Sequence, residues 1–305
     1  MNNATGNVID NASSSAAIKC ENITHYYGSR LIYENLSFEV KEGSILGLLG
    51  KNGTGKTTII NILNGYLKPY SGTCSILGES MDNIRPETKA RIGLLLEGHV
   101  QHDFFNVEQI EKFYSNFFPN WNRDLYYELL RRLQVTMKQP LNTMSCGQRS
   151  QVALGLLFAQ NPDILILDDF SMGLDPGYRR LFVEYLKEFV TAENKTIFLT
   201  SHIIQDMEML IDDCMMLDYG RILTHRPTAE IIDNFKRFQF TPNDATFDPA
   251  KIADERLWNI EKLANGDWEC YSFAPEAEVG QLLTQDVKGE RLSLEDAFIG
   301  LAGKY

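Results

Sequence analysis

The stretch GKNGTGKT, from Gly50 to Thr57, has the residue types and spacing of a phosphate-binding loop. It matches the pattern G-x-x-x-x-G-K-[ST] in full. Its glycines let the backbone curl so that successive N–H groups point at phosphate oxygens, and a helix that begins there adds its N-terminal donors. Lys56 would reach the terminal phosphates, and Thr57 would offer a hydroxyl to Mg²⁺. The residues expected to bind nucleotide in this loop are Gly50, Asn52, Gly53, Gly55, Lys56, Thr57 and Thr58.

Two adjacent carboxylates, Asp168 and Asp169, end a later apolar run, ILILDD. Mg²⁺ takes oxygen ligands and keeps several waters, so a strand-end carboxylate beside the phosphate loop can hold it from the far side. We predict this role for Asp168. Asp169 is then placed to orient or deprotonate an attacking water. A pair of solvated strand-end charges is the alternative, and the complete phosphate loop argues against it.

These residues require strands that end at one edge of a sheet. SILGLLG (44–50), ILILDD (164–169) and TIFLTSH (196–202) are continuous apolar runs, typical of central strands covered on both faces. A segment with helical spacing follows the glycine-rich loop, and another spans 177–192. Strand, loop and helix in this order predict an α/β fold: a P-loop NTPase core whose mixed or parallel sheet has flanking helices.

The remaining segments divide the chain. Residues 1–17 are small and polar, and we expect a disordered lead-in. Residues 18–225 would form the nucleotide-binding domain, with a mostly helical subdomain inserted at about 82–159. Residues 226–305 would form a small C-terminal accessory domain. It would contain a hairpin that turns at 265–267 and a final helix in SLEDAFIGLAGKY.

Composition bounds the possible functions. The net charge of −12 opposes nonspecific binding to nucleic acid or to an anionic lipid surface. The five cysteines are scattered, with no CxxC pair, which favours reduced thiols in a cytosolic compartment over disulfides or zinc. No stretch approaches the roughly 18 consecutive apolar residues that a spanning helix needs. We therefore expect a cytoplasmic protein that does not bind nucleic acid.

The pentapeptide MSCGQ, residues 144–148, lies just ahead of the strand that ends in the two carboxylates. Ser145 and Gln148 have capping-box spacing at the head of an apolar helix, and with Gly147 beside them this helix start is a second anion site. The pentapeptide resembles L-S-G-G-Q, the signature of the ATP-binding cassette (ABC) ATPases, and the resemblance runs from about Ile18 to Arg226. It implies a dimer, identical or mixed, with two composite ATP sites in which the signature of one chain closes over the nucleotide of the other.

The resemblance also implies roles for single residues. Tyr27 lies where the family stacks an aromatic ring on adenine, with a core or surface tyrosine as the alternative. Asp175 lies in the family's dimer-contact loop, and His202 matches its switch histidine, which touches the γ-phosphate and the catalytic water. Glu97 stands where the family usually has a Gln that reaches Mg²⁺ and water.

Two further departures from the family pattern concern the chemistry. Cys146 replaces a signature glycine and adds bulk near the phosphate. Asp169 stands where the family usually has its catalytic Glu, and it keeps the charge while shortening the reach by one methylene. Because a displacement of about 1 Å can cost ~10²-fold in rate, we expect ATP binding and dimer closure with slow hydrolysis.

The segment FFPNWNRDLYYELLRRLQV and the ending RLSLEDAFIGLAG are similar to ATPase subunits of small exporters whose membrane domain is a separate polypeptide. The resemblance implies an ATP-hydrolysing motor for export, held at the cytoplasmic face of the membrane by an integral permease. The loop Glu97–Ile110 would receive the permease, with Phe104 and Phe105 either at that contact or in the core. The alternatives are a non-transport ABC ATPase and a regulatory module that binds ATP with little hydrolysis.

Overall fold

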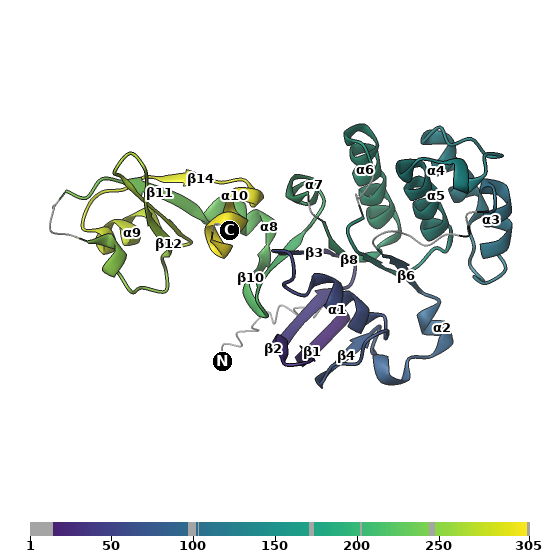
Figure 1. Ribbon diagram of the computed structural model, residues 1–305, viewed down its shortest axis with the longest axis horizontal. Helices are drawn as coiled ribbons and strands as arrows, with labels where there is room; N and C mark the ends of the chain where they lie inside the picture. The colour runs from purple at the N-terminus through teal and green to yellow at the C-terminus, as the bar shows by residue number, and fades with distance from the viewer. Residues whose placement is uncertain are drawn as a thin grey trace, which may run out of the picture.

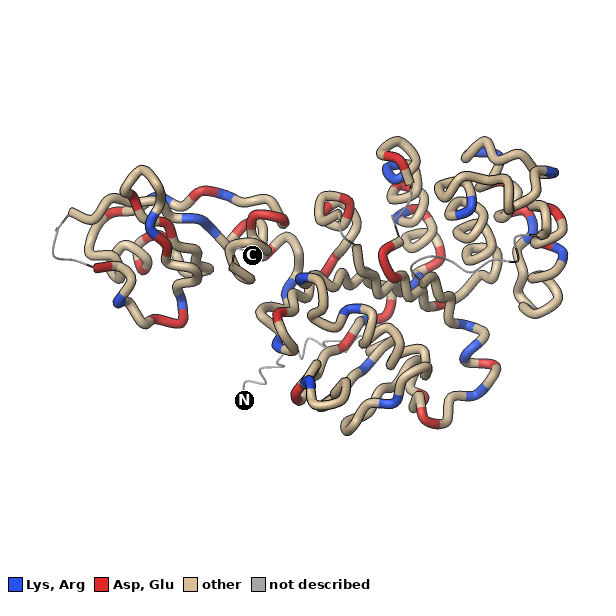
Figure 2. The backbone as a smooth tube through the Cα atoms, in the orientation of Figure 1, with Lys and Arg blue, Asp and Glu red and all other residues tan. Residues whose placement is uncertain are grey.

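The computed structural model describes residues 15–96, 102, 104–170, 174–201, 203–243 and 248–303. A central sheet with helices on both faces lies between an antiparallel sheet and a C-terminal unit (Figure 1). Acidic and basic residues are spread over all of these parts (Figure 2). In the described part of the chain, no helix combines the length and the apolar composition needed to cross a bilayer.

The central sheet has six strands. Their spatial order is β10 (Arg221–Pro227), β9 (Asp213–Asp218), β3 (Ile45–Gly50), β8 (Thr196–Thr200), β7 (Ile164–Leu167) and β6 (Ile92–Leu95). All neighbouring pairs are parallel except β9 and β10, so the sheet is mixed, as predicted. Because parallel strands end at the same edge, the ends of β3, β7 and β8 bring the phosphate loop, the two carboxylates and Thr200 together.

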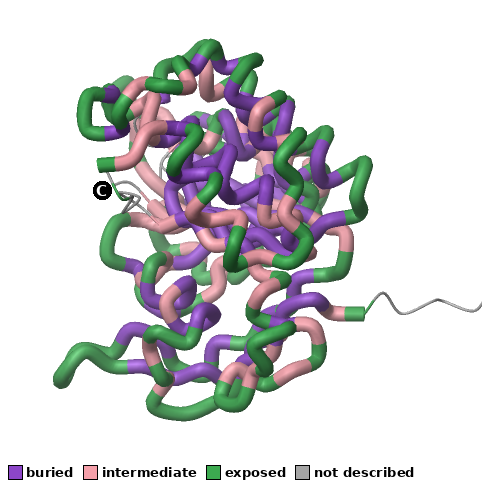
Figure 3. The backbone as a smooth tube through the Cα atoms, turned by 90° about the vertical axis from the view of Figure 1, so that its right-hand side faces the viewer, coloured by how far each residue is buried: buried purple, intermediate pink, exposed green. Residues whose placement is uncertain are grey.

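Alternation along the strands divides the core between the two faces of this sheet. In β7, Leu165 and Leu167 join one buried cluster, whereas Ile164 and Ile166 join the other. Helices α5 (Cys146–Ala159) and α6 (Pro176–Glu193) cover the first face, and α1 (Lys56–Leu63) lies on the second. Figure 3 shows the buried segments in the interior and the exposed segments at the outer loops. Coverage on both faces explains why these strands are apolar throughout.

A four-stranded antiparallel sheet packs beside α1. Its order is β2 (Arg30–Lys41), β1 (Ala16–Tyr27), β4 (Ser71–Ile76) and β5 (Glu79–Ser80). Buried Leu36, Phe38 and Val40 alternate with exposed residues along β2, as the sequence pattern predicts. The hairpin between β1 and β2 places Arg30 opposite Tyr27.

The region between residues 82 and 159 is only partly helical. Its elements are η1 (Met81–Asn83), α2 (Pro86–Lys89), β6, α3 (Val107–Tyr114), α4 (Arg123–Arg132), η2 (Leu141–Thr143) and α5. Helices α3 and α4 begin at Asn106 and Asn122, whose side-chain oxygens accept hydrogen bonds from backbone N–H groups of the first turn. The short run IGLL forms β6 and pairs with β7, so this segment belongs to the central sheet.

The C-terminal unit has its own sheet and core. The sheet order is β12 (Trp258–Lys262), β13 (Trp268–Ser272), β11 (Lys236–Phe240) and β14 (Gly289–Arg291), and the helices are α8 (Thr228–Asn234), η3 (Pro249–Lys251), α9 (Glu276–Leu283) and α10 (Leu294–Ala302). The predicted hairpin is β12–β13, and the predicted final helix is α10. Helix α10 packs back against α7 (Ile204–Glu208) and β9, so this unit contacts the nucleotide-binding core.

Candidate nucleotide-binding site

The phosphate loop joins the end of β3 to the start of α1, and Gly55 is the N-cap of that helix. Gly55 has φ +105°, and a Cβ at this position would lie 2.4 Å from the hydroxyl oxygen of Tyr33. That hydroxyl donates a hydrogen bond to the Gly55 carbonyl. The backbone N–H and the hydroxyl of Thr54 both donate to the Lys51 carbonyl, at 3.3 and 2.8 Å. A glycine is therefore required at position 55, and internal hydrogen bonds fix the curl of the loop.

The ammonium group of Lys56 lies against the loop itself. Its Nζ atom donates to the carbonyls of Gly50, at 2.6 Å, and Lys51, at 3.1 Å. Burial lowers the pKa of Lys56, whereas the negative charges of Asp168 and Asp169 act in the opposite direction. The positive charge thus lies between the loop and the carboxylates, where phosphate oxygens would compete with the carbonyls for it.

Asp168 and Asp169 are buried at the end of β7, and the Thr200 hydroxyl contacts the side chain of the first and the backbone of the second. The Thr200 hydroxyl donates to Asp168 Oδ1 at 2.8 Å and accepts from the Asp169 backbone N–H at 3.0 Å. Asp169 has φ +45°, in the left-handed region that aspartate tolerates better than most residues. Register explains the contact, because Leu167 of β7 pairs with Leu199 of β8.

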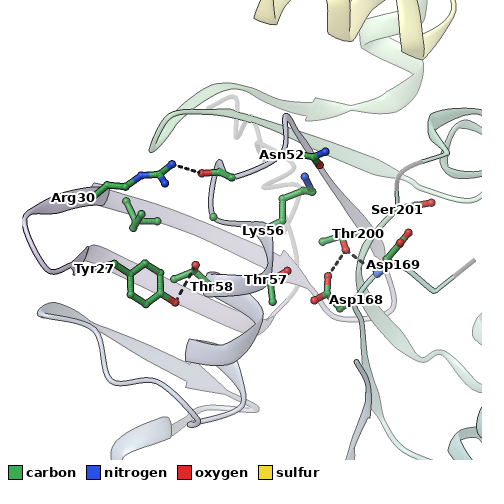
Figure 4. Close-up of a pocket in the computed structure, with 13 residues that line it drawn as sticks. Tyr27, Arg30, Asn52, Lys56, Thr57, Thr58, Asp168, Asp169, Thr200 and Ser201 are labelled. Atoms are coloured by element: carbon green, nitrogen blue, oxygen red, sulfur yellow. Dashed lines mark hydrogen bonds between the residues drawn. The ribbon is translucent and has the colours of Figure 1, made fainter. Parts of the chain in front are cut away.

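A cavity of about 420 Å³ lies over these groups (Figure 4). The predicted residues that line it are Tyr27, Asn52, Gly53, Gly55, Lys56, Thr57, Thr58, Asp168 and Asp169. Gly50 contributes through its carbonyl, which holds Lys56. The residues predicted to bind triphosphate and the two carboxylates, which come from separate parts of the sequence, therefore share one cavity.

Four lining residues were not predicted, namely Arg30, Ile32, Thr200 and Ser201. Arg30 Nη2 donates to the Gly53 carbonyl at 3.1 Å, and Figure 4 shows its guanidinium group extending over the loop. The Tyr27-Gly28 turn signal could have located Arg30, because a tight turn after Tyr27 places the next strand opposite it. Thr200 and Ser201 lie in the LTS run that ends β8, beside the strand that carries the carboxylates.

Tyr27 lies at the outer end of the cavity, with half of its surface exposed. Its hydroxyl lies 3.4 Å from the Thr58 hydroxyl, and its ring meets His25 edge to face at 5.0 Å. The core alternative for this tyrosine is wrong, because an exposed ring next to the phosphate loop is not part of the core. An aromatic face in this position can stack on a base.

The chemistry of the donors fits Mg²⁺. Asp168 Oδ2 is buried and has no hydrogen-bond partner among the described residues, and Thr57 lines the same cavity. No group of three or more His, Cys, Asp or Glu side chains that could hold a metal occurs in the described part of the chain. Mg²⁺ is usually held by one or two protein ligands together with water and phosphate, so this sparse set suits it.

The signature residues lie outside this cavity. Ser145 is the N-cap of α5 and forms the predicted capping box: its Oγ accepts from the Gln148 N–H at 3.2 Å, and Gln148 Oε1 accepts from the Ser145 N–H at 3.0 Å. Cys146 is exposed, and none of Ser145, Gly147 and Gln148 is among the lining residues. The second anion site predicted from this segment is thus separate from the first within one chain.

Three other predicted residues are Asp175, Glu97 and His202. Asp175 is the N-cap of α6, and its Oδ1 accepts from the N–H groups of Gly177 and Tyr178 at 3.0 and 3.2 Å. It does not line the cavity. Glu97 and His202 lie outside the described residues, and their roles stay predictions.

The chain is similar in sequence to transport ATPases. The family described as "ABC transporter" matches residues 33–171. The Nod factor export ATP-binding protein I of Ralstonia nicotianae is 31% identical over 315 residues, which cover 95% of this chain and 95% of that protein. The bacitracin transport ATP-binding protein BcrA of Bacillus licheniformis is 30% identical over 308 residues, which cover 95% of this chain and 98% of that protein.

Solved structures share the fold. The dimeric structure of MJ0796, a bacterial ABC transporter cassette, matches with a TM-score of 0.62 at 20% identity, covering 69% of this chain and 98% of that chain. The structure of the ATP-binding subunit of an ABC transporter matches with a TM-score of 0.64 at 24% identity. The match covers 71% of this chain and 92% of that chain. Fold, cavity and sequence relatives agree: this chain belongs to the ATP-binding cassette transporter family, as a subunit that binds and hydrolyses ATP.

Proposed function

We propose that two chains close head to tail around two ATP molecules, and that closure drives a separate membrane subunit. This proposal rests on the separation of the two predicted anion sites within one chain. The cavity at Lys56 and the capped helix start at Ser145 each offer donors for phosphate, yet Ser145 does not line the cavity. A second chain in inverted orientation would bring its Ser145 over the open side of the cavity.

Dimer closure can be tested directly. The Asp169→Asn variant should bind ATP without hydrolysing it and should become dimeric when ATP is added. Ser145→Arg in this background should abolish the ATP-dependent dimer, because the larger side chain would fill the space meant for phosphate. Ser80→Arg, at the exposed start of η1, is the matched control and should still dimerise. Light scattering reports the mass, and a dimer that survives Ser145→Arg would contradict the arrangement.

Within this site we propose that Tyr27 stacks on adenine, that the loop amides and Lys56 hold the phosphates, and that Asp169 orients the attacking water. Thr57 and Asp168 would hold Mg²⁺, which when bound would offset the negative charge of the phosphates. Thr200 fixes the positions of Asp168 and of the Asp169 backbone. We also propose that Glu97 and His202 complete the site, that Asp175 lies at the dimer contact, and that hydrolysis is slow because Asp169 replaces the usual Glu.

A groove at the β6 edge of the central sheet, lined by residues of α1, β6 and α5, suits a membrane partner. This groove, of about 680 Å³, is mainly apolar, and its apolar lining includes Leu63, Tyr66, Met81, Pro86, Leu94, Leu96, Tyr114, Phe118, Leu156 and Leu157. Phe104 is exposed near the start of α3, whereas Phe105 packs against the core. We propose Phe104 alone for the contact with the partner. We propose that the groove receives a helix of an integral permease, and that this attachment holds the chain at the cytoplasmic face of the membrane.

Copurification tests the partner. An integral membrane protein should copurify with this chain from solubilised membranes, and nucleic acid should not. Tyr66→Glu places a charge in the groove and should release the partner, whereas Tyr70→Glu, also exposed but outside the groove, should retain it. If both variants retain the partner, the groove is not the contact.

The relatives' names include Nod factor export and bacitracin transport, and on that likeness we propose export as the direction of transport.

The second candidate is a regulatory ATP clamp with little hydrolysis. Asp169 and the exposed Cys146 favour it, because the first stands where the family usually has its catalytic Glu and the second replaces a signature glycine. Phosphate release decides between the two. Turnover in the wild-type complex clearly above that of Asp169→Asn supports the motor, whereas equal turnover supports the clamp.

We further propose that residues 18–225 act as the nucleotide-binding domain, with the helical subdomain inserted, and that 226–305 form an accessory domain.

A further inference from the structure

Helix α10 connects the C-terminal unit to the phosphate loop. At its end, the Ala302 carbonyl accepts a hydrogen bond of 2.8 Å from Lys51 Nζ, across 251 residues of sequence. Lys51 is the second residue of the glycine-rich loop. The last carbonyls of a helix carry partial negative charge, so an ammonium group at this position is favoured both as a charge-assisted hydrogen bond and by the helix dipole.

The same helix is fixed at several points. At its start, the Leu294 N–H donates to Glu208 Oε2 of α7 at 2.9 Å. Near its end, Asn259 Nδ2 donates to the Gly300 carbonyl at 2.5 Å. Gly300 packs so closely on β13 that a Cβ there would lie 2.5 Å from the ring of Tyr271. With nine residues at about 1.5 Å each, α10 is roughly 13 Å long. Contacts with both the core and the C-terminal sheet fix its position.

Lys51 also determines the shape of the loop through its backbone. Its carbonyl accepts hydrogen bonds from Thr54 and from Lys56 Nζ. Lys51 therefore bonds to α10 through its side chain and fixes the curl of the loop through its backbone. Loop amides bind phosphate well only if they already point inward before the ligand arrives. Figure 4 shows a helix of the C-terminal unit above the loop that carries Asn52.

We propose that α10 of the C-terminal unit preorganises the phosphate loop through Lys51, which acts as a positioning residue for nucleotide binding. The C-terminal unit is then a positive regulator of the affinity for ATP and ADP. A ligand or partner that moves this unit away from the core would release the loop and weaken nucleotide binding.

ADP binding to the full-length chain is the measurement, because ADP contacts the loop without hydrolysis, and neither dimer closure nor a permease is needed. Lys51→Met should weaken ADP binding about five- to tenfold with little change in the thermal midpoint. Lys51→Arg keeps a charged donor and should stay within about twofold of wild type. Lys251→Met removes an exposed lysine of the C-terminal unit and should change nothing. An unchanged affinity in Lys51→Met would overturn the proposal, whatever the outcome of the dimer and permease tests.

A double-mutant cycle tests whether α10 is the partner that matters. Gly300→Ala drives a methyl group into Tyr271 and should shift α10 without touching Lys51. It should weaken ADP binding in the same direction, and adding Lys51→Met should cause less than about a twofold further loss. Fully additive losses would overturn the proposal. If Gly300→Ala fails to fold, the Met and Arg variants at Lys51 decide: equal losses in both would sink it. By reciprocity, ADP should slow hydrogen exchange in the last turn of α10.

Discussion

Lengthening the carboxylate at position 169 should speed hydrolysis. In Asp169→Glu the side chain gains one methylene, which extends its reach by roughly 1 Å or slightly more. The backbone cannot absorb this change easily, because the Asp169 N–H is bonded to Thr200 and the residue is only 4% exposed. The carboxylate itself should therefore lie further into the cavity. If the shorter side chain is the cause of slow turnover, the gain should approach ~10²-fold, or about 2.7 kcal/mol of barrier.

The assay is steady-state phosphate release at saturating ATP and Mg²⁺, together with an independent measurement of nucleotide affinity. Lys56→Ala, which removes the cation between loop and carboxylates, is the negative control, and Asp169→Asn gives the background without a carboxylate. Glutamate tolerates the left-handed backbone at φ +45° less well than aspartate, so a stability loss of about 1 kcal/mol is expected and is read from the thermal midpoint. If Asp169→Glu folds, binds ATP and turns over no faster than wild type, reach does not limit this enzyme.

Three further substitutions probe the same site. Thr200→Val should cost about 1–3 kcal/mol of stability and lower the turnover, because Asp168 loses a buried donor; chemical denaturation and phosphate release measure the two effects. Gly55→Ala forces a methyl group against Tyr33 at a positive φ, so nucleotide binding measured by calorimetry should be lost, and normal affinity would show that the loop adapts. Tyr27→Ala should weaken ATP binding about tenfold while Tyr27→Phe keeps it, since the ring provides the stacking face; similar losses in both would assign the role to the hydroxyl instead.

Local patterns predicted most of the site because its residues lie at the ends of strongly apolar strands. Once β3 and β7 are parallel strands of one sheet, Lys56 and Asp168 must lie at the same edge. The capping box at Ser145 was also predictable, because both of its hydrogen bonds form within four residues.

Contacts between distant elements were beyond sequence patterns. Thr200 contacts the Asp168 carboxylate and the Asp169 backbone only because of the register between β7 and β8. The contact of Lys51 with Ala302 depends on how the C-terminal unit docks. The run that forms β6 is four residues long, and such a short apolar run does not distinguish a strand from part of a helix.

The hydrogen bonds of Lys56 have a consequence for selectivity. Its ammonium group donates to two backbone carbonyls, so an anion that binds Lys56 must compete with those carbonyls. A ligand that binds Lys56 gains only the difference in free energy between the hydrogen bonds to its own oxygens and those to the two carbonyls. A single inorganic phosphate would offer little beyond this exchange, whereas a nucleotide bound as proposed would add a base on Tyr27 and further phosphates on the loop amides. We therefore expect the loop to favour a nucleotide over a single phosphate ion.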